Sequence, residues 1–506
     1  MPNLATLLTD SAAASPGARA VVLDDSVLTY GALDDLSARV ASLLTSRGVR
    51  AGDRVALILP NVPHMPVAYY GVLRTGGVVV PLNPLLSPRE LGYHFQDAEV
   101  SLVLVWETVA GAARAAAAEL GRDVPVVEIT AAGTLPELRR VPPLPEVAER
   151  AGEDPAVLLY TSGTTGRPKG AVLTHANLTS NARLSAELFS LAPGDVMFGG
   201  LPFFHVFGQT VALNGALGAG ATVTLLPRFD PARALEILVR DEVTVFAGVP
   251  SMYVALLRAA GGEPVRAPHL RAGVSGGSPL PVEVLERFEA LFGAPIYEGY
   301  GLSETSPVVC FNQEDRGRRP GSIGTVVRGA QLRVLDDAGA EVPVGEIGEL
   351  AVAGEYVMAG YWRNPEATAA AIQDGWFRTG DLARVDEDGF YWIVDRKKDM
   401  VLRGGYNVYP REIEEVLYQY PGIAEAAVVG VPDEAMGEEV AAVVAFRDVP
   451  EPERPARLDE LDAFVRERLA RYKHPRWYKV VEELPKGPTG KILKRSLDLE
   501  GAVRRS

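Results

Sequence analysis

Short apolar runs alternate with longer helical segments along much of this chain, and no other sequence feature restricts its fold as strongly. Four runs predict buried strands: Arg54–Leu59, Gly77–Leu82, Ser101–Val105 and Ala221–Leu226. Between them lie segments with helical spacing of apolar residues, at Tyr30–Arg47, Pro231–Arg240 and Pro281–Leu291. Such alternation is typical of parallel sheets covered by helices. The sequence therefore predicts an α/β fold.

The pattern changes twice toward the C-terminus. Around 320–395, short strands punctuated by glycine predict a small antiparallel barrel or sheet. After about 397 a new pattern begins, with helices at 410–420 and 458–469 and strands at 424–431 and 439–446. This stretch is long enough for a small separate domain. We expect a surface helix in the alanine-rich 110–122 and a loop in 447–457, which is rich in proline and charge.

Composition excludes several classes of protein. With 506 residues, the chain is too long for one compact domain, and 47% apolar residues suffice for a large core. The net charge of −15, without a basic block, argues against a nucleic-acid partner. The single cysteine, Cys310, rules out an intramolecular disulfide, and the six histidines lack zinc-ligand spacing.

The sequence also bears on location. The opening MPNLATLLTD lacks a basic segment followed by an apolar run, so we predict no signal peptide. No uncharged apolar stretch reaches the ~18 residues that a membrane span needs. We therefore expect a cytoplasmic protein without a transmembrane segment. Peripheral membrane contact and the choice between monomer and homodimer stay open.

The stretch Tyr160–Gly170, YTSGTTGRPKG, has the composition of a phosphate-binding loop. Its glycines allow main-chain N–H groups to approach an anion, its hydroxyls add neutral donors, and Lys169 adds a positive charge. It is not a Walker A loop, because Pro168 occupies the place of the second glycine and Gly170 follows the lysine.

This loop and four further motifs resemble the adenylate-forming superfamily, which includes acyl-CoA synthetases, peptide-synthetase adenylation domains and luciferases. The other motifs are GYGLSE at Gly299–Glu304, WFRTGD at Trp376–Asp381, DRKKDMVLRGG at Asp395–Gly405 and PKGPTGK at Pro485–Lys491. They occur in the order typical of the family and span most of the chain. The closest resemblance is to medium- and long-chain fatty acyl-CoA ligases.

The resemblance implies a division of the chain into two domains. Residues 1–395 would form a large N-terminal AMP-binding domain of two αβ-layered subdomains and a small β-barrel, the last at about 320–395. Residues 396–398 would be a hinge, at which Lys398 occupies the pivot position. Residues 399–506 would form a small, mobile α+β C-terminal domain.

The resemblance also implies a binding site for ATP. The residues of the phosphate loop that it assigns to this site are Thr161, Ser162, Gly163, Thr164, Thr165 and Lys169. Gly299 and Tyr300 would enclose the adenine, with the tyrosine ring flat on the base, and Ser303 would contact the α-phosphate. Asp381 and Arg396 would bind the ribose, because a carboxylate accepts hydrogen bonds from hydroxyls.

Three further residues complete the implied reaction centre. Glu304 is the only carboxylate in GYGLSE and would bind Mg²⁺ together with phosphate oxygens. Lys491 would be the catalytic cation that reaches the substrate carboxylate and the α-phosphate. Gly405 would let the pantetheine arm of coenzyme A pass once the C-terminal domain has rotated.

The acid substrate is implied by a fourth group of residues. His205 matches the histidine that flanks the acyl carboxylate in fatty acyl and aryl-CoA ligases, and Phe207, Pro307 and Val308 would touch the acyl group. Glu298 stands directly before GYGLSE, where an arginine would favour a malonate-type diacid. The apolar surroundings are consistent with an alkyl chain.

Three hypotheses about function follow. The first is an ATP-dependent fatty acid–CoA ligase, with a 4-coumarate-like aryl-CoA ligase as its variant. The second is a ligase that loads a fatty acid onto an acyl carrier protein, although the insertion often found in that branch is absent. The third is a binding protein without catalysis, against which the full set of motif residues argues. Chain length of the acid and the pathway stay open.

Overall fold

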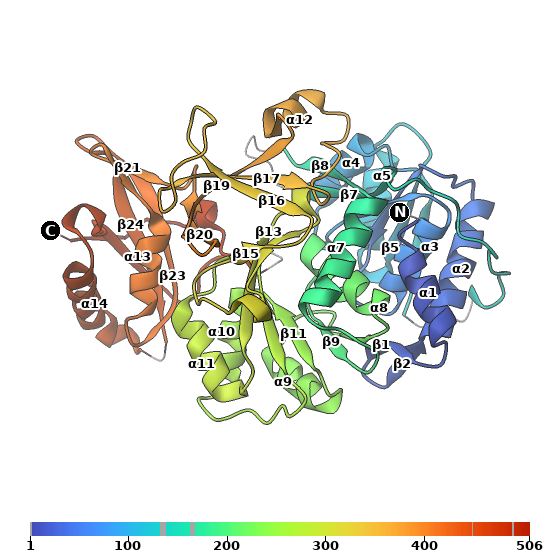
Figure 1. Cartoon of the computed structure of the whole chain (residues 1–506), viewed down its shortest axis with the longest axis horizontal. Helices are drawn as coiled ribbons and strands as arrows, with labels where there is room; N and C mark the ends of the chain where they lie inside the picture. Colours follow the sequence, from blue (N-terminus) through green and yellow to red (C-terminus); the bar gives the residue numbers. More distant parts are fainter. Residues whose placement is uncertain (1–2, 132–137, 162–166, 448, 488–489, 506) are drawn as a thin grey trace.

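The computed structural model describes residues 3–131, 138–161, 167–447, 449–487 and 490–505. The elements after residue 400 lie at one end of the molecule, opposite the N-terminal elements (Figure 1). Three sheets organise these residues: a six-stranded N-terminal sheet, a long mixed sheet and a six-stranded C-terminal sheet.

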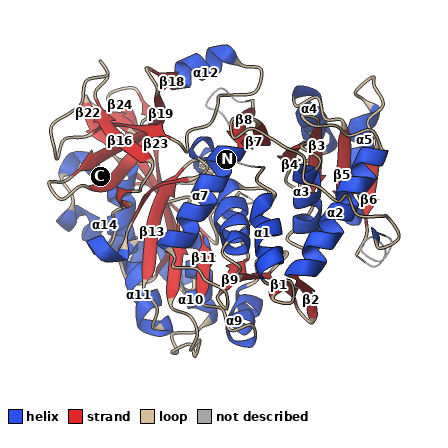
Figure 2. Cartoon of the chain, turned by 45° about the vertical axis from the view of Figure 1, so that its right-hand side comes forward, coloured by secondary structure: helices blue, strands red, loops and turns tan. Residues whose placement is uncertain are grey.

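The N-terminal sheet has the order β6-β5-β3-β4-β7-β8 and is parallel except for the β7–β8 pair (Figure 2). Alternate residues of β3 point to opposite faces. Val55 and Leu57 join the core that includes helices α2 and α3, whereas Ala56 and Ile58 join the core with α4 and α5. The strands are β3 (Arg54–Ile58), β4 (Val78–Pro81), β5 (Leu102–Trp106), β6 (Val126–Ile129), β7 (Pro155–Thr161) and β8 (Lys169–Thr174), and the helices are α2 (Tyr30–Ser46), α3 (His64–Arg74), α4 (Pro88–Asp97) and α5 (Ala110–Ala118).

One half of the long sheet is mainly parallel and forms a second αβ layer with the order β13-β12-β11-β9-β10-β1-β2. Its strands are β1 (Arg19–Leu23), β2 (Ser26–Thr29), β9 (Val196–Gly199), β10 (Thr222–Leu225), β11 (Val245–Gly248), β12 (Ala272–Ser275) and β13 (Ile296–Gly301). The accompanying helices are α1 (Thr6–Ala14), α7 (His175–Leu188), α8 (Ala216–Gly218), α9 (Pro231–Arg240), α10 (Pro250–Ala259) and α11 (Val282–Phe292), with a π-helix at Phe207–Gly215.

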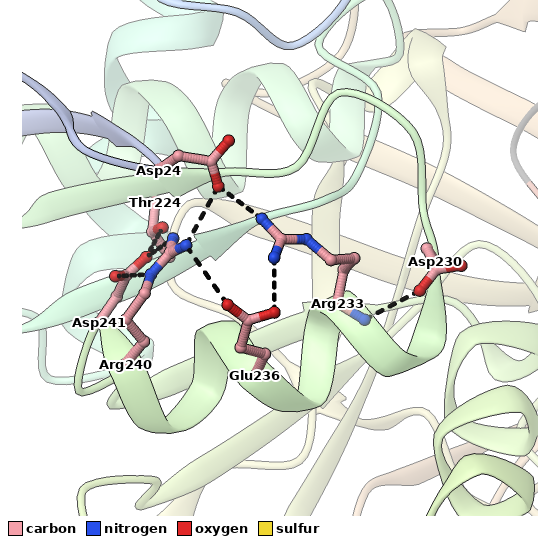
Figure 3. A network of polar contacts seen from close by, with 7 residues as sticks. All are labelled: Asp24, Thr224, Asp230, Arg233, Glu236, Arg240 and Asp241. Carbon is pink, nitrogen blue, oxygen red and sulfur yellow. Dashed lines mark hydrogen bonds and ion pairs between the residues drawn. The ribbon is translucent and has the colours of Figure 1, made fainter.

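Ion pairs tie the outer β1–β2 turn of this layer to helix α9 (Figure 3). Asp24 accepts hydrogen bonds from Arg233 (2.7 Å) and Arg240 (3.1 Å), both on α9. Asp241 pairs with Arg240 and also accepts a 2.5 Å hydrogen bond from the hydroxyl of Thr224 on β10. The network fixes the end of α9 against the sheet, far along the sheet from β13.

The other half of the long sheet is antiparallel and corresponds to the predicted barrel or sheet. Its order is β16-β17-β19-β20-β15-β14, with β18 paired to β19, and β14 joins β13. Val334, Leu350 and Ala383 form a small apolar cluster of their own. Within the described residues this path is open, so no closed barrel is found there. The elements are β14 (Val308–Phe311), β15 (Gly324–Val326), β16 (Ala330–Leu335), β17 (Gly348–Gly354), α12 (Pro365–Ala371), β18 (Ile372–Gln373), β19 (Trp376–Val385) and β20 (Phe390–Arg396).

The C-terminal sheet has the order β22-β21-β24-β25-β26, with β23 paired to β24. Its own apolar core includes Ile413 and Leu417 of α13 and Leu461 and Val465 of α14. The elements are β21 (Val401–Arg403), β22 (Tyr406–Val408), α13 (Pro410–Tyr418), β23 (Ile423–Asp433), β24 (Gly437–Phe446), α14 (Arg454–Arg468), β25 (Trp477–Val481) and β26 (Val503–Arg504).

The predicted elements hold with one exception. The four apolar runs and the three helical segments all coincide with elements of the same type, within a few residues at the ends. The prediction of a loop over 447–457 is wrong in its last part, because α14 begins at Arg454. Pro455 fits there, since the first turn of a helix does not need the missing N–H group.

Candidate active site

Strands β7 and β8 close the base of the predicted phosphate loop. Thr161, the last residue of β7, pairs in register with Lys169, the first residue of β8. The ladder therefore fixes both ends of the loop at one edge of the N-terminal sheet. Ser162, Gly163, Thr164 and Thr165 lie outside the described residues, so their contacts with ATP stay predictions.

Glu304 joins this loop to the long sheet. Its side chain is only 8% exposed, and its Oε1 accepts hydrogen bonds from the Thr161 hydroxyl (3.2 Å) and the Tyr361 hydroxyl (3.0 Å). The ammonium of Lys169 lies 5.2 Å from the centre of the Tyr361 ring, a cation–π contact. The carboxylate and the lysine of two separate motifs are thus connected through one tyrosine.

The turn that carries Glu304 needs a glycine at its start. A Cβ atom on Gly301 would lie 1.7 Å from the carbonyl oxygen of Pro307, so no other residue fits without moving the backbone. Ser303, Glu304 and Thr305 form a short 3-10 helix directly after β13. The half-buried Ser303 lies beside Glu304 there, as predicted from the motif.

Tyr300, Asp381 and Arg396 meet next to this turn. The Tyr300 hydroxyl donates a 2.5 Å hydrogen bond to Oδ2 of Asp381, and Nε of Arg396 lies 3.5 Å from Oδ1. Asp381 and Arg396 are register partners in the β19–β20 ladder, which explains their closeness. Burial, followed by the charge of Asp381, raises the pKa of Tyr300 well above its usual value, so the ring stays neutral.

Lys491 reaches the same place from the C-terminal part of the chain. Burial, and after it the positive charge of Arg396, lowers the pKa of Lys491 to about 8, while Asp381 acts in the opposite direction. Burial and then the charge of Lys491 lower the pKa of His205 to about 4. These electrostatic effects place Lys491 within electrostatic range of His205, Asp381 and Arg396.

The loop before Lys491 rests on helix α10. Gly490 has a positive φ of 77°, and a Cβ atom there would lie 2.4 Å from the Ser251 hydroxyl and 3.2 Å from a Val249 methyl group. A side chain at this position would therefore push the loop away from the N-terminal part of the protein.

The predicted acyl-binding residues lie close to His205 and Glu304 in the chain. Nδ1 of His205 accepts a long hydrogen bond, 3.4 Å, from the backbone N–H of Phe207. A Cβ atom on Gly276 would lie 3.3 Å from the Phe207 ring, which therefore packs against bare backbone. Val308 is buried, and its N–H and C=O both bond to the Asn181 amide, at 3.1 and 2.9 Å. Pro307 is buried beside it.

The structure does not bring Gly405 to this cluster. Gly404 and Gly405 form the exposed turn between β21 and β22, and both have positive φ values. A Cβ atom on Gly405 would meet nothing within 4 Å. Lys398 is exposed in the connection between β20 and β21, where the hinge was predicted.

Arg411 at the start of α13 spans the same connection. Its guanidinium donates to the carbonyl of Ile393 on β20 and, at 3.4 Å, to that of Gly321. Its backbone N–H donates a 2.9 Å hydrogen bond to Oδ2 of Asp395. These contacts hold helix α13 against the antiparallel half of the long sheet.

Two carboxyl groups, those of Glu298 and Glu415, lie within electrostatic range of Arg411. The charge of Arg411 acts on both carboxyl groups, and Glu415 also accepts a hydrogen bond from the backbone N–H of Val282, the first residue of α11. Burial raises the pKa of Glu298 to about 7, with Arg411 opposing the shift. Glu298 itself accepts a 3.2 Å hydrogen bond from the backbone N–H of Leu280, so its link to Arg411 on α13 is electrostatic.

The side chains around Glu304 are compatible with a Mg²⁺ ion that takes most of its ligands from a bound nucleotide and only one from the protein. No group of three or more His, Cys, Asp or Glu side chains placed to hold a metal occurs among the residues that the structure describes. Mg²⁺ commonly takes one or two carboxylates and completes its octahedron with phosphate oxygens and water. One buried carboxylate beside a phosphate loop meets that requirement.

Among the residues that the structure describes, no helix is long and apolar enough to cross a membrane.

Sequence analysis missed Tyr361, which contacts two of the predicted site residues. Its segment, GYWRNPEAT, lies outside the motifs used above. Nothing in this segment marks Tyr361 as a binding residue, because a tyrosine after a glycine is common in turns and Arg363 two positions later is a plain surface charge by type. Only the contact with Glu304, 57 positions away, reveals it.

Comparisons with known proteins identify the family and the fold. The AMP-binding enzyme model matches residues 8–362, and the model of the AMP-binding enzyme C-terminal domain matches residues 412–491. A long-chain-fatty-acid–CoA ligase of Bacillus subtilis is 38% identical over 539 residues, covering 98% of this chain and 94% of that protein. A feruloyl-CoA synthase of Amycolatopsis is 39% identical over 496 residues, covering 97% and 96%.

Among solved structures, ATP-bound MatB from Rhodopseudomonas palustris has a TM-score of 0.90 at 35% identity and covers 98% of both chains. This match confirms the mixed α/β fold with a large N-terminal and a smaller C-terminal domain. Fold and site together define a two-domain adenylate-forming CoA ligase. The chain belongs to the AMP-binding enzyme family.

Proposed function

We propose that this protein is an ATP-dependent fatty acid–CoA ligase. It would join a fatty acid to AMP with release of pyrophosphate and then transfer the acyl group to the thiol of coenzyme A. The observation that carries the proposal is that Lys491 lies within electrostatic range of residues from both proposed substrate sites, Asp381 and Arg396 on one side and His205 on the other. One cation within range of both groups supports a role where the acid and the nucleotide must meet.

In the first step, a carboxylate oxygen of the acid attacks the α-phosphorus of ATP, and pyrophosphate leaves. Two anions approach each other, so the reaction needs neutralised charge and accurate positioning more than a protein nucleophile. Lys491 would supply the positive charge at the attacking carboxylate and the α-phosphate. His205 is neutral at physiological pH because its pKa is about 4, so it would position the carboxylate as a hydrogen-bond donor.

Glu304 would hold Mg²⁺, with Lys169 and the phosphate loop on the phosphate oxygens. When bound, the ion would neutralise phosphate charge and align the leaving pyrophosphate. Thr161, Ser162, Gly163, Thr164 and Thr165 would donate to the phosphates, and Gly299, Tyr300 and Ser303 would contact the adenine and the α-phosphate.

In the second step, the thiol of coenzyme A attacks the carbonyl carbon of acyl-AMP, and AMP leaves. We propose that the C-terminal domain, residues 399–506, rotates about the hinge 396–398 between the steps. In the present orientation Gly405 is exposed, away from the reaction centre. Rotation would bring it to the path of the pantetheine arm, which a side chain would obstruct.

The apolar residues support an alkyl substrate. Phe207, Pro307 and Val308 carry no charge, and no cationic partner for a second carboxylate is part of this group. The 38% identity to a long-chain-fatty-acid–CoA ligase supports the same choice. An aryl acid is the second candidate, because a feruloyl-CoA synthase is as similar, at 39%.

A panel of acids tests the proposal. Pyrophosphate release and thioester formation would be measured with acetate, butyrate, octanoate, palmitate, malonate and 4-coumarate, with coenzyme A or a phosphopantetheinylated carrier protein as acceptor. We expect kcat/KM to rise from acetate to at least octanoate, with coenzyme A as the preferred acceptor and little use of malonate. A preference for coumarate over every alkyl acid would replace this proposal by the aryl-CoA ligase. Thioester on the carrier protein alone would indicate the acyl-carrier-protein ligase.

We further propose that the protein acts in fatty acid metabolism in the cytoplasm. Its partners would be small molecules: the acid, ATP and coenzyme A. No nucleic acid is needed for this chemistry.

A further inference from the structure

The backbone around Tyr361 is attached to the strand that carries Lys169. Trp362 donates from its N–H to the carbonyl of Gly170 (2.7 Å), and Ala359 donates to that of Val172 (3.0 Å). Val172 donates in return to the carbonyl of Gly360 (2.9 Å). The segment therefore acts as a short additional strand beside β8. Its position relative to Lys169 is set by the backbone rather than by side chains.

The hydroxyl and the ring of Tyr361 contact two different groups. The hydroxyl donates to Oε1 of Glu304 at 3.0 Å, and the face of the ring lies 5.2 Å from the Lys169 ammonium. We propose that Tyr361 is a positioning residue that sets Glu304 for the metal and Lys169 for the phosphates. This inference rests on the proposed ATP-dependent function and adds a residue to it.

The pattern of hydrogen bonds at Glu304 supports this role. Both hydroxyl donors, from Thr161 and Tyr361, reach Oε1. In the described part of the chain no hydrogen bond reaches Oε2, which is therefore available as a ligand. A carboxylate that binds a metal through one oxygen is commonly fixed by hydrogen bonds to the other.

The hydroxyl of Tyr361 has a single O–H donor, and Glu304 accepts it at 3.0 Å. The ring, in turn, offers its negative face to Lys169 and restrains a long flexible side chain that would otherwise sample many positions.

Two substitutions separate the roles of the hydroxyl and the ring. Tyr361→Phe removes the hydrogen bond to Glu304 and keeps the ring, whereas Tyr361→Leu removes both. Tyr356→Phe is the matched control, because its hydroxyl donates to the backbone carbonyl of Arg328 (2.6 Å) and, among the residues that the structure describes, forms no hydrogen bond with a predicted site residue. Glu304→Gln serves as the reference for loss of the metal ligand.

Binding is the readout, so no acid substrate is needed. Mn²⁺ would be added to the full-length protein with ATP and followed by electron paramagnetic resonance, and metal-free ATP binding would be measured by calorimetry in EDTA. We expect Tyr361→Phe to weaken Mn²⁺ binding about 10-fold or more, with metal-free ATP affinity unchanged. Tyr361→Leu should weaken both, and Tyr356→Phe should match the wild type.

The outcomes distinguish this inference from the proposed function. Wild-type Mn²⁺ affinity in Tyr361→Phe, or an equal loss of metal-free ATP binding in that variant, would overturn the role of the tyrosine while leaving the ligase intact. Absence of Mn²⁺–ATP binding in the wild type would instead contradict the proposed function. Circular dichroism and the thermal midpoint of each variant would show that the fold is retained.

Discussion

The positive charge of Lys491 acts on His205, although the two residues are far apart in the chain and belong to different parts of the fold. It is the second cause, after burial, of the lowered pKa of His205. In the present orientation of the C-terminal part, the predicted catalytic lysine is therefore within electrostatic range of the predicted carboxylate-binding histidine. The proposed first step, formation of acyl-AMP, would need both residues near the acid.

The first prediction concerns the two half-reactions. Lys491→Ala should reduce acyl-AMP formation by about 10²–10³-fold, because a positioned charge of this kind is worth roughly 3–4 kcal/mol in the transition state. Thioester formation from supplied acyl-AMP should stay largely intact, since that step uses the other orientation. Each half-reaction would be measured by rapid quench. Equal losses in both steps would contradict a role confined to adenylation.

The second prediction concerns pH. The pKa of Lys491 is lowered to about 8, so the ammonium that adenylation needs is lost as the pH rises through that value. We expect kcat/KM for ATP, which reports the free enzyme, to be highest below pH 8 and to fall above it. Lys491→Arg should lack this fall, because arginine stays charged, even if its overall rate is lower. A wild-type profile that stays level to pH 10 would show that Lys491 does not titrate as proposed.

The third prediction concerns the contact between α13 and β20. Arg411→Ala removes the hydrogen bonds to Ile393 and Gly321 and should make the present orientation less populated. We expect adenylation to slow by about 10-fold or more, since a hydrogen bond to a charged group contributes about 1.5–3 kcal/mol. The thioester step should keep its rate or become faster. Arg457→Ala is the control, because Arg457 forms an exposed pair with Glu460 on α14 and should change neither step. Loss of both steps in Arg411→Ala would indicate a purely structural role.

The fourth prediction concerns the acyl group. Val308→Trp should fill space at the buried Val308 and shift the preferred acid to shorter chains. Each methylene that no longer reaches apolar wall should cost up to about fourfold in kcat/KM, from about 0.8 kcal/mol per buried CH₂. ATP affinity should not change. If the chain-length profile is the same in the variant and the wild type, Val308 does not line the acyl site.

Much of the fold could be predicted because the apolar runs are unambiguous. Runs such as Arg54–Leu59 lie in strands that are buried on both faces, where continuous apolar sequence has no other interpretation. The start of α14 could not be predicted in the same way. The proline and charges before it are typical of a loop, yet they are also tolerated in the first turn of a helix.

In the candidate site, too, some residues could be predicted from local sequence and others could not. Tyr300, Glu304, Asp381 and Lys491 lie in local motifs, and the resemblance of those motifs to the adenylate-forming superfamily implies their roles. Tyr361 and Arg411 act through contacts with residues remote in sequence, or through backbone carbonyls that leave no trace in the sequence. Tertiary packing decides which elements of a long chain face each other. No local pattern in a single sequence shows that packing.

Transfer of oxygen from the acid to AMP tests the central claim most directly. The first step joins a carboxylate oxygen to the α-phosphorus, and AMP keeps that oxygen when the thiol displaces it. With octanoate labelled with ¹⁸O in both carboxyl positions, mass spectrometry of the products should show one ¹⁸O atom in AMP and one in octanoyl-CoA. Unlabelled AMP, or ¹⁸O in inorganic phosphate with ADP as the nucleotide product, would contradict the account.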